Sequence, residues 1–374
     1  MLDEGLLDDT ERLLAADRSG ALRALAGAGA QVRQSAFLAG EAGVDRLPEA
    51  DRPRAVVVLG AGHAALAGDL VAALGGPRGH APVLVLRDPG VLPLWVGVAD
   101  LVLAVSHVGT EIGLLSALDD AAGRGASVLG VGPADTPLQD ACARARAVFL
   151  PVPVGWPPYA ALWSLATPLL LAAHTMGLFP LDRRELDLTA DLLDTVAERC
   201  RPASGPFVNP AKVVALELAE ALPVLWAGSG LGAVAARRFA IQLAGRAAVP
   251  AVWGLLPGAL VESGGLLDTT PGPDADQTAD LFRDRVAEPA VTRPRLVLLG
   301  DPVEPRPGPD HLGRARRFAE ERGVGVTELR PEGSGPVRRF ASLVALGDFA
   351  SVYLGLAGGR DPAGVRADEN EPGI

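Results

Sequence analysis

Three short turns in this sequence combine glycines with hydroxyl or ionisable side chains, and each follows an apolar run. We call them the Gly60 turn (residues 60–65, GAGHAA), the Ser106 turn (106–111, SHVGTE) and the Gly228 turn (228–233, GSGLGA). Between a strand and a helix, such a turn presents backbone N–H groups and the positive end of the helix dipole to an anion such as phosphate. The candidate ligand-binding residues are therefore Gly60, Gly62, Ser106, Gly109, Thr110, Gly228, Ser229 and, on the helix after the third turn, Arg237.

Candidate proton-transfer groups are fewer. His63 and His107 lie within the first two turns, and Glu262 lies in the second half of the chain. An imidazole or a carboxylate in a cleft can act as a general acid or base. Each residue also has a plainer interpretation, because a loop histidine or glutamate is more often a solvated side chain. In the same way, Ser106 before an apolar helix can be an ordinary N-cap, and Arg237 with its neighbour Arg238 can form structural ion pairs.

The elements that must hold these turns alternate along the chain. Helical patterns, including 112–123 and 336–357, separate short apolar runs, and this alternation favours parallel sheets covered on both faces by helices. A strand, a glycine turn and a helix are predicted with similar sequences at 55–74 and 223–238, which indicates an internal duplication. The runs that predict strands are 55–59, 82–86, 101–105, 127–131 and 147–150 in the first half, and 223–227, 295–299 and 324–329 in the second.

Composition divides the chain into five segments. The first is expected to hold two helices with an apolar stripe formed by Leu6, Leu7, Leu13 and Leu14. Residues 264–276 contain a Pro-Gly-Pro sequence and are expected to form a loop. The expected segments are an N-terminal helical segment (1–45), a first α/β domain (46–152), a helical connector (153–204), a second α/β domain (205–360) and a polar tail (361–374).

Several classes of function are disfavoured by composition. A length of 374 residues suffices for two well-filled domains, and a net charge of −11 disfavours a nucleic-acid partner. Two isolated cysteines and five scattered histidines suggest neither a disulfide framework nor a metal site. The most apolar window, 160–176, is shorter than the ~20 residues of a membrane span, so we expect a buried helix there. The acidic N-terminus is unlike a secretory signal, so we expect a cytoplasmic protein without a membrane partner.

Taken in order, the motifs resemble one family. Residues 60–70 (GAGHAALAGDL) resemble the opening motif GMGGSAIAGDL of bifunctional phosphoglucose/phosphomannose isomerases, and the Ser106 turn resembles the SIS loop SYSGNT. Further matches follow at 115–118, 235–243 and 342–362. The resemblance implies two SIS domains, each a flavodoxin-like parallel sheet between helices, usually in a homodimer. It also implies a phosphorylated sugar or related carbohydrate derivative, bound without cofactor or metal between the domains at the strand ends that carry Gly60, Ser106 and Gly228.

The same resemblance implies a damaged phosphate cradle. Ser106 and Gly109 match the family loop, and Thr110 stands where asparagine is usual. The hydroxyl of a family serine is lost at Val108, and that of a family threonine at Glu111. A carboxylate at a helix N-terminus complements the dipole, but it would compete with a phosphate for the same N–H groups. Ala64 replaces a further serine of the family motif.

The catalytic positions implied by the family are also replaced. Gly245 stands where the family has its glutamate base, and Val261 stands where it has a histidine. The family also has a lysine near its C-terminus, whereas Lys212 is the only lysine of this chain. Loss of a general base alone typically lowers a rate by ~10²–10⁴.

We therefore expect a carbohydrate-derivative (sugar-phosphate) binding SIS protein with little or no isomerase turnover, in other words a pseudoenzyme. Two alternatives remain open. The first is an active glucose-6-phosphate/mannose-6-phosphate aldose–ketose isomerase in which Glu262, His107 or His63 has taken over proton transfer. The second is a dinucleotide-binding protein, because the Gly60 turn also fits a dinucleotide fingerprint, with Asp88 just past the next strand as a ribose ligand.

Overall fold

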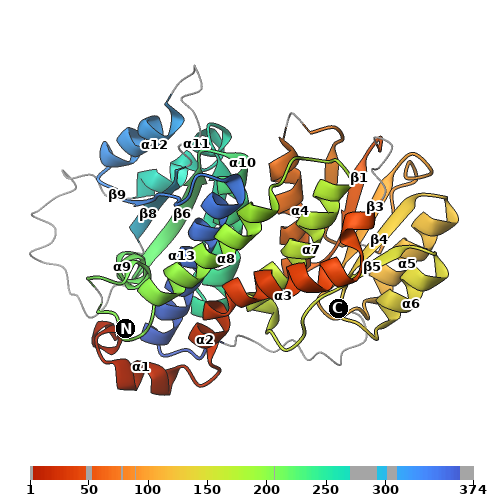
Figure 1. The fold of residues 1–374 in the computed structure, drawn as a ribbon. Helices are drawn as coiled ribbons and strands as arrows, with labels where there is room; N and C mark the ends of the chain where they lie inside the picture. The colour runs from red at the N-terminus through yellow and green to blue at the C-terminus, as the bar shows by residue number, and fades with distance from the viewer. Residues whose placement is uncertain are drawn as a thin grey trace, which may run out of the picture. The chain divides into compact units, whose positions relative to one another are not determined.

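Two compact units make up the computed structural model, each built on its own parallel sheet (Figure 1). The first-sheet unit is centred on Arg23–Thr195, and the second-sheet unit on Val196–Ser334 with Met1–Leu22 and most of the last helix. The predicted class, α/β with two parallel sheets flanked by helices, is confirmed. The segment boundaries given above stay a prediction. The structure describes residues 3–47, 53–76, 79–88, 90–205, 207–269, 293–300 and 310–362.

The first sheet has the strand order β2-β1-β3-β4-β5, and all of its pairs are parallel. This flavodoxin-like order reverses direction between β1 and β3, which is where open α/β sheets bind ligands. Every residue of β1 and β3 is buried, as expected for central strands that are covered on both faces. The strands are β1 (Val56–Leu59), β2 (Val83–Leu86), β3 (Leu101–Val105), β4 (Ser127–Gly132) and β5 (Val148–Pro151).

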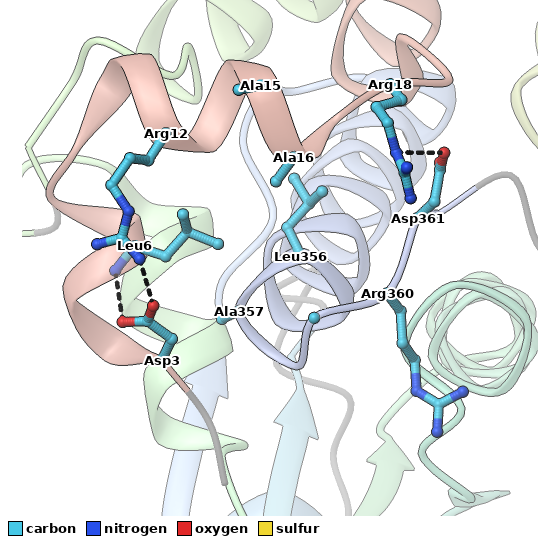
Figure 2. A pocket seen from close by; sticks show the side chains of 11 residues that line it. Asp3, Leu6, Arg12, Ala15, Ala16, Arg18, Leu356, Ala357, Arg360 and Asp361 are labelled. Atoms are coloured by element: carbon cyan, nitrogen blue, oxygen red, sulfur yellow. Dashed lines mark hydrogen bonds and ion pairs between the residues drawn. The ribbon is translucent and has the colours of Figure 1, made fainter.

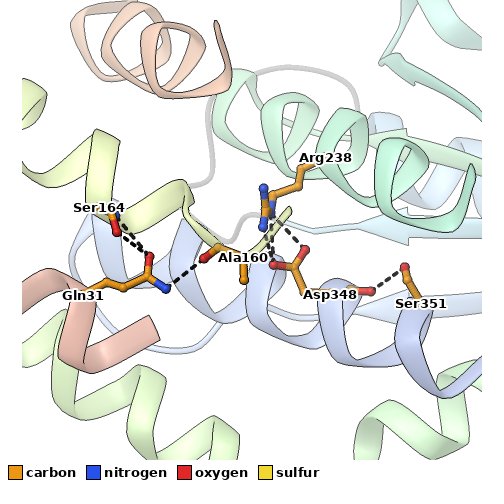
Figure 3. A network of polar contacts seen from close by, with 7 residues as sticks. Gln31, Ala160, Ser164, Arg238, Asp348 and Ser351 are labelled. Carbon is orange, nitrogen blue, oxygen red and sulfur yellow. Dashed lines mark hydrogen bonds and ion pairs between the residues drawn. The ribbon is translucent and has the colours of Figure 1, made fainter. Parts of the chain in front are cut away.

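Helices cover the two faces of the first sheet, with α3, α4 and α7 on one side and α5 and α6 on the other (Figure 1). A buried glutamine joins α3 to the start of α7, since Gln31 donates to the Ala160 carbonyl at 2.9 Å and accepts from the Ser164 amide at 3.1 Å (Figure 3). The helices are α3 (Ala28–Glu41), α4 (Gly62–Gly75), α5 (Ile112–Gly123), α6 (Pro137–Arg144) and α7 (Leu162–Thr175).

The second sheet has one strand fewer, in the parallel order β7-β6-β8-β9. The sequence did not predict β7, because its four residues include Gly254 and its other side chains are only partly covered at the sheet edge. The strands are β6 (Ala221–Ala227), β7 (Val252–Leu255), β8 (Arg293–Leu299) and β9 (Gly325–Leu329). The helices of this unit include α9 (Pro210–Glu217), α10 (Gly230–Gln242), α11 (Gly258–Ser263), α12 (His311–Glu320) and α13 (Pro336–Ala357), and α8 (Arg183–Arg199) precedes them.

Lys212 on α9 has a structural position in the second-sheet unit. It is 1% exposed, and its Nζ donates to the carbonyls of Leu7 at 2.7 Å, Pro202 at 2.7 Å and Ser204 at 2.9 Å. Burial lowers the pKa of this ammonium group. The single lysine therefore links α9 to the backbone at Leu7 and to the backbone at 202–204. Its N–H groups already donate to these carbonyls.

The N-terminal segment differs from the two helices predicted. It forms η1 (Glu4–Leu7), α1 (Thr10–Ala16), α2 (Ala21–Ala26), α3 and η2 (Val44–Arg46). The segment breaks because Asp9 caps the Arg12 amide and the Asp17 carboxylate accepts the Ala21 amide at 2.8 Å. Leu14 is 53% exposed and does not belong to the apolar stripe. The loop expected at 264–276 is also partly wrong, since Gly264–Thr269 forms the 3₁₀ helix η6 and the rest lies outside the described residues.

Two apolar helices bear on the question of a membrane. The window at 160–176 corresponds to α7, which is buried from Leu162 to Ala173, so the expected buried helix is confirmed. Among the described residues, α13 alone is long and apolar enough to cross a membrane, and 94% of its apolar window is buried inside the protein. Such burial is typical of the core helix of a globular unit.

Candidate functional site

The Ser106 turn lies at the carboxyl end of β3, and its own residues use the serine hydroxyl completely. Ser106 is 0% exposed, and its Oγ accepts the N–H groups of Val108 at 3.1 Å and Gly109 at 2.6 Å. The same hydroxyl donates to the Glu111 carboxylate, whose two oxygens lie 2.8 and 2.6 Å away. Glu111 is half-buried and immediately precedes α5. A carboxylate thus occupies the end of the turn where the positive pole of α5 favours an anion.

Two glycines give this end of the sheet its shape. Gly109 has φ +75°, and a Cβ there would lie 2.5 Å from Thr136 Oγ1. Gly60 is buried at the end of β1, and a Cβ there would lie 3.1 Å from the Val105 carbonyl oxygen, at the end of β3. The Gly60 and Ser106 turns are therefore neighbours at the point where the strand order reverses, as the sequence predicted for parallel strands.

The other candidates of the first-sheet unit lie in the same two turns. Gly62 is exposed with φ +51° at the start of α4, and the next residue, His63, is half-buried. His107 is half-buried beside Ser106, and Thr110 is exposed. All four residues lie in the turns that follow β1 and β3, and each is at least partly exposed.

The Gly228 turn follows β6 in the second-sheet unit. Ser229 caps α10 in the ordinary way, since its Oγ accepts the Gly232 amide at 3.0 Å. Gly228 is exposed, and a Cβ there would lie 3.0 Å from the Leu312 side chain. Arg237 lies seven residues into α10, about 10 Å along the axis from the helix start. Its guanidinium stacks over the Trp253 ring on β7 at 5.7 Å, a cation–π contact.

Arg238, the second arginine of the pair, takes the structural alternative. It is 1% exposed, and its Nε and Nη2 donate to the Asp348 carboxylate of α13 at 2.9 and 2.7 Å (Figure 3). Burial raises the pKa of Asp348, and the Arg238 charge opposes that rise. This two-bonded pair joins α10 to α13 inside the second-sheet unit.

The two residues that the resemblance places at the base and histidine positions, Gly245 and Val261, have no titratable side chain. Gly245 lies exposed in η5 (Leu243–Ala247), a π-helical turn that continues α10. Such turns are frequent at functional sites. Val261 on α11 is 87% exposed, and Glu262 beside it is exposed too. No group of three or more His, Cys, Asp or Glu side chains that could hold a metal occurs among the described residues.

A cavity of about 330 Å³ lies elsewhere in the second-sheet unit, and no pattern in the sequence indicated it. It lies between η1, α1 and the end of α13, and none of the predicted site residues lines it (Figure 2). Its arginines are largely neutralised, since Arg12 pairs with Asp3 at 2.7 Å and Arg18 lies 3.9 Å from Asp361. Arg360 points away from the apolar floor (Figure 2). The cavity therefore offers no concentrated charge.

Comparison with known proteins bears on both halves of the chain. Residues 207–367 match the family described as the bacterial phospho-glucose isomerase C-terminal SIS domain. A bifunctional phosphoglucose/phosphomannose isomerase from Caldicellulosiruptor bescii is 26% identical over 318 residues, which cover 83% of this chain and 86% of that protein. Because it covers 83% of the chain, this second match extends the similarity beyond the C-terminal domain and into the first half of the sequence.

Solved structures share the fold. A glucose-6-phosphate isomerase like protein from Thermus thermophilus has a TM-score of 0.53 at 20% identity, with 95% of this chain and 94% of that chain covered. A glucosamine-6-phosphate deaminase from Thermotoga maritima has a TM-score of 0.60 at 12% identity, with 91% and 96% covered. These identities establish the architecture alone. The C-terminal domain match and the similarity along most of the sequence support the family that the motifs resemble, the bifunctional phosphoglucose/phosphomannose isomerases with SIS domains.

Proposed function

We propose that this chain binds a carbohydrate derivative, specifically a phosphorylated sugar, at the carboxyl ends of β1 and β3, and that it has lost isomerase turnover. The observation that carries the proposal is the Ser106 turn. The turn lies at the switch point of the first sheet, and Gly109 keeps the positive φ that the turn requires. The Ser106 hydroxyl holds the Val108 and Gly109 N–H groups in place, and a phosphate would have to displace it to reach them. Family membership supports a sugar phosphate as the ligand class, because relatives carry that substrate in their names.

The loss of turnover follows from the chemistry of the reaction. Aldose–ketose isomerisation moves a proton between two neighbouring carbons, and it needs a positioned general base and polar groups that stabilise an enediol. Gly245 and Val261 stand where the family has its glutamate and histidine, and neither has a titratable side chain. Lys212 is held by three carbonyls in the interior and is not available to a ligand.

A paired measurement tests both parts of the proposal. One protein preparation is assayed for isomerisation of mannose 6-phosphate and glucose 6-phosphate, and its thermal unfolding is followed with and without each ligand. At about 100 times Kd a ligand adds about 2.7 kcal/mol to the free energy of unfolding, which is a shift of several degrees. A shift without turnover is the expected result. Clear turnover overturns the loss of isomerase activity, and the absence of both signals overturns ligand binding.

Turnover would favour the alternative of an active isomerase in which another residue has taken over proton transfer. Its three candidates lie in different elements, so each can be tested by its own substitution. His63 and His107 lie in the turns after β1 and β3, whereas Glu262 lies on α11 of the other unit. Alanine at the residue responsible should lower the rate by ~10²–10⁴. If all three alanine variants keep the wild-type rate, this alternative fails.

The dinucleotide alternative lacks support. The strand order 2-1-3-4-5 of the first sheet differs from the 3-2-1-4-5-6 order of the fold that carries the dinucleotide fingerprint. Asp88 is exposed just after β2. The relatives named above are sugar-phosphate isomerases and a deaminase, and none of their names contains a dinucleotide.

The expected assembly belongs to the same proposal. We infer a homodimer in the cytoplasm, without a nucleic-acid or membrane partner, from the family resemblance and the net charge of −11. Size-exclusion chromatography with light scattering should give twice the 38.4 kDa of one chain. A single-chain mass at micromolar concentration would contradict the homodimer.

A further inference from the structure

Glu111 is the residue of the Ser106 turn that the family resemblance does not explain. The resemblance puts a threonine at this position, whose hydroxyl would donate to a phosphate, whereas Glu111 can only accept while it is ionised. Its carboxylate already receives the Ser106 hydroxyl at 2.6 and 2.8 Å. A phosphate that entered the turn would need that same hydroxyl.

The helix that follows adds to this competition. Glu111 immediately precedes α5, a helix of 12 residues, and has extended backbone angles. The first N–H groups of an α-helix have no partner within it, so they and the dipole attract whichever negative group lies closest. The Glu111 side chain makes no hydrogen bond to these N–H groups and bonds the Ser106 hydroxyl instead, so its charge lies within the turn that leads into α5.

The charges around the strand ends also oppose a dianion. Arg87 and Asp88 follow β2, Glu111 follows β3 and Asp135 follows β4. Arg87 is an ion-pair partner of Asp69, and within the part of the chain that the structure describes no arginine or lysine pairs with Glu111. Two like charges a few ångströms apart at a protein surface repel strongly, so a phosphate would be opposed by Glu111 unless its side chain moved away.

We propose that Glu111 is a resident competitor of phosphate: its carboxylate holds the Ser106 hydroxyl of the turn, and a phosphoryl group gains that hydroxyl only when Glu111 releases it. Glu111 thereby sets both the affinity of this turn for phosphate and its selectivity against dianionic ligands. The sugar part of the ligand rests on the function proposed above, but the competition for phosphate does not. The contact is thus an autoinhibitory one built into the site.

Titration calorimetry with inorganic phosphate, at an ionic strength held constant with sodium chloride, tests the competition without a sugar. Glu111→Thr restores the hydroxyl donor and removes the charge, and it should bind phosphate at least about tenfold more tightly than the wild type. Glu111→Gln removes the charge but keeps an acceptor for Ser106, so a smaller gain is expected. Asp119→Asn is the matched control, because it removes one negative charge from the exposed side of the same helix and should leave phosphate affinity unchanged.

Every outcome decides the proposal. Equal phosphate affinity in the wild type and Glu111→Thr overturns it, whether both bind or neither does, provided that both melt at similar temperatures. A gain that Asp119→Asn reproduces also overturns it, since net charge alone would then explain the effect. The same titration with glucose 6-phosphate distinguishes the competition by Glu111 from the proposed binding of a sugar phosphate. If Glu111→Thr gains phosphate but binds glucose 6-phosphate no better than phosphate, the competition stands and the sugar-binding proposal fails.

Discussion

Each unit of the molecule holds a carboxylate whose surroundings define its role. Asp348 in the second-sheet unit is 6% exposed and meets the buried Arg238 through two nitrogens. Glu111 in the first-sheet unit is half-buried and is held by a serine hydroxyl at the end of a strand. The first charge is neutralised within the core, whereas the second lies in the turn where we propose that phosphate binds. A carboxylate of the first kind serves the fold, and one of the second kind affects recognition.

Substitutions of Asp348 and Glu111 should differ most in their effect on the free energy of unfolding. Asp348→Ala removes the carboxylate that the buried Arg238 guanidinium bonds, and removal of one member of a buried pair lowers the free energy of unfolding by about 3–5 kcal/mol. Urea unfolding followed by circular dichroism measures this loss. By contrast, Glu111→Thr should change the same quantity by less than about 1 kcal/mol, because a half-exposed charge is screened by water.

A double variant shows whether the stability lost in Asp348→Ala is due to the buried Arg238 charge. Arg238→Met combined with Asp348→Leu replaces the pair by apolar side chains, which is often neutral or stabilising. We expect it to recover most of the stability lost in Asp348→Ala. If the single variant loses less than about 1 kcal/mol, Asp348 is no more structural than Glu111 and the comparison fails.

The shape of the Ser106 turn provides the second prediction. Gly109→Ala puts a methyl group at φ +75° and 2.5 Å from Thr136 Oγ1, so the turn must shift, and the free energy of unfolding should fall by about 1–3 kcal/mol. Gly62→Ala is the matched control. Its φ is +51°, but the described residues leave more than 4 Å of open space around the new methyl group. Thermal unfolding of the two variants should therefore separate the cost of the contact with Thr136 from the cost of placing a Cβ at positive φ. Equal losses of stability in the two variants would exclude a cost from crowding at Gly109.

Much of the fold was predictable because its central elements are buried on all sides. The apolar runs of β1 and β3 are each followed by a turn that contains glycine, and α5 and α13 were predicted with the bounds that the structure has. Prediction failed where burial is partial. β7 alternates half-buried and exposed side chains, and the N-terminal helices are divided by aspartate caps that read in the sequence as ordinary polar residues.

The candidate site was predictable in its location but not in its internal bonds. Parallel strands bring Gly60 and Ser106 to one edge whatever their separation in sequence, so their proximity follows from topology. The pairing of Arg238 with Asp348 spans 110 residues, and no spacing rule selects that partner. The Ser106–Glu111 bond spans five residues, yet it depends on a turn conformation that the glycine at 109 permits but does not specify.

A third carboxylate lies between the two extremes and is expected to have the smallest effect. The Asp100 side chain is 0% exposed, and its Oδ2 lies 2.6 Å from Nη2 of Arg54, whose side chain is 57% exposed. The Arg54 hydrogen bonds hold the pKa of Asp100 below its ordinary value, so the folded state favours the ionised form. This stability is present above the unfolded pKa near 4 and is lost as pH falls through the lower folded pKa.

Asp100→Asn should therefore lower the free energy of unfolding by about 1 kcal/mol at pH 7, and the difference from the wild type should shrink as pH falls below about 4. Urea unfolding at pH 7, 5 and 3.5 measures both effects. Arg54→Gln is the matched control, since it removes the cation that lowers the pKa and should reproduce the same pH dependence. A difference between Asp100→Asn and the wild type that stays constant across this range would mean that the charge is immaterial. Asp100 would then act through its fit as a hydrogen-bond acceptor, for instance of the Gly97 amide at 2.9 Å, and not through its charge.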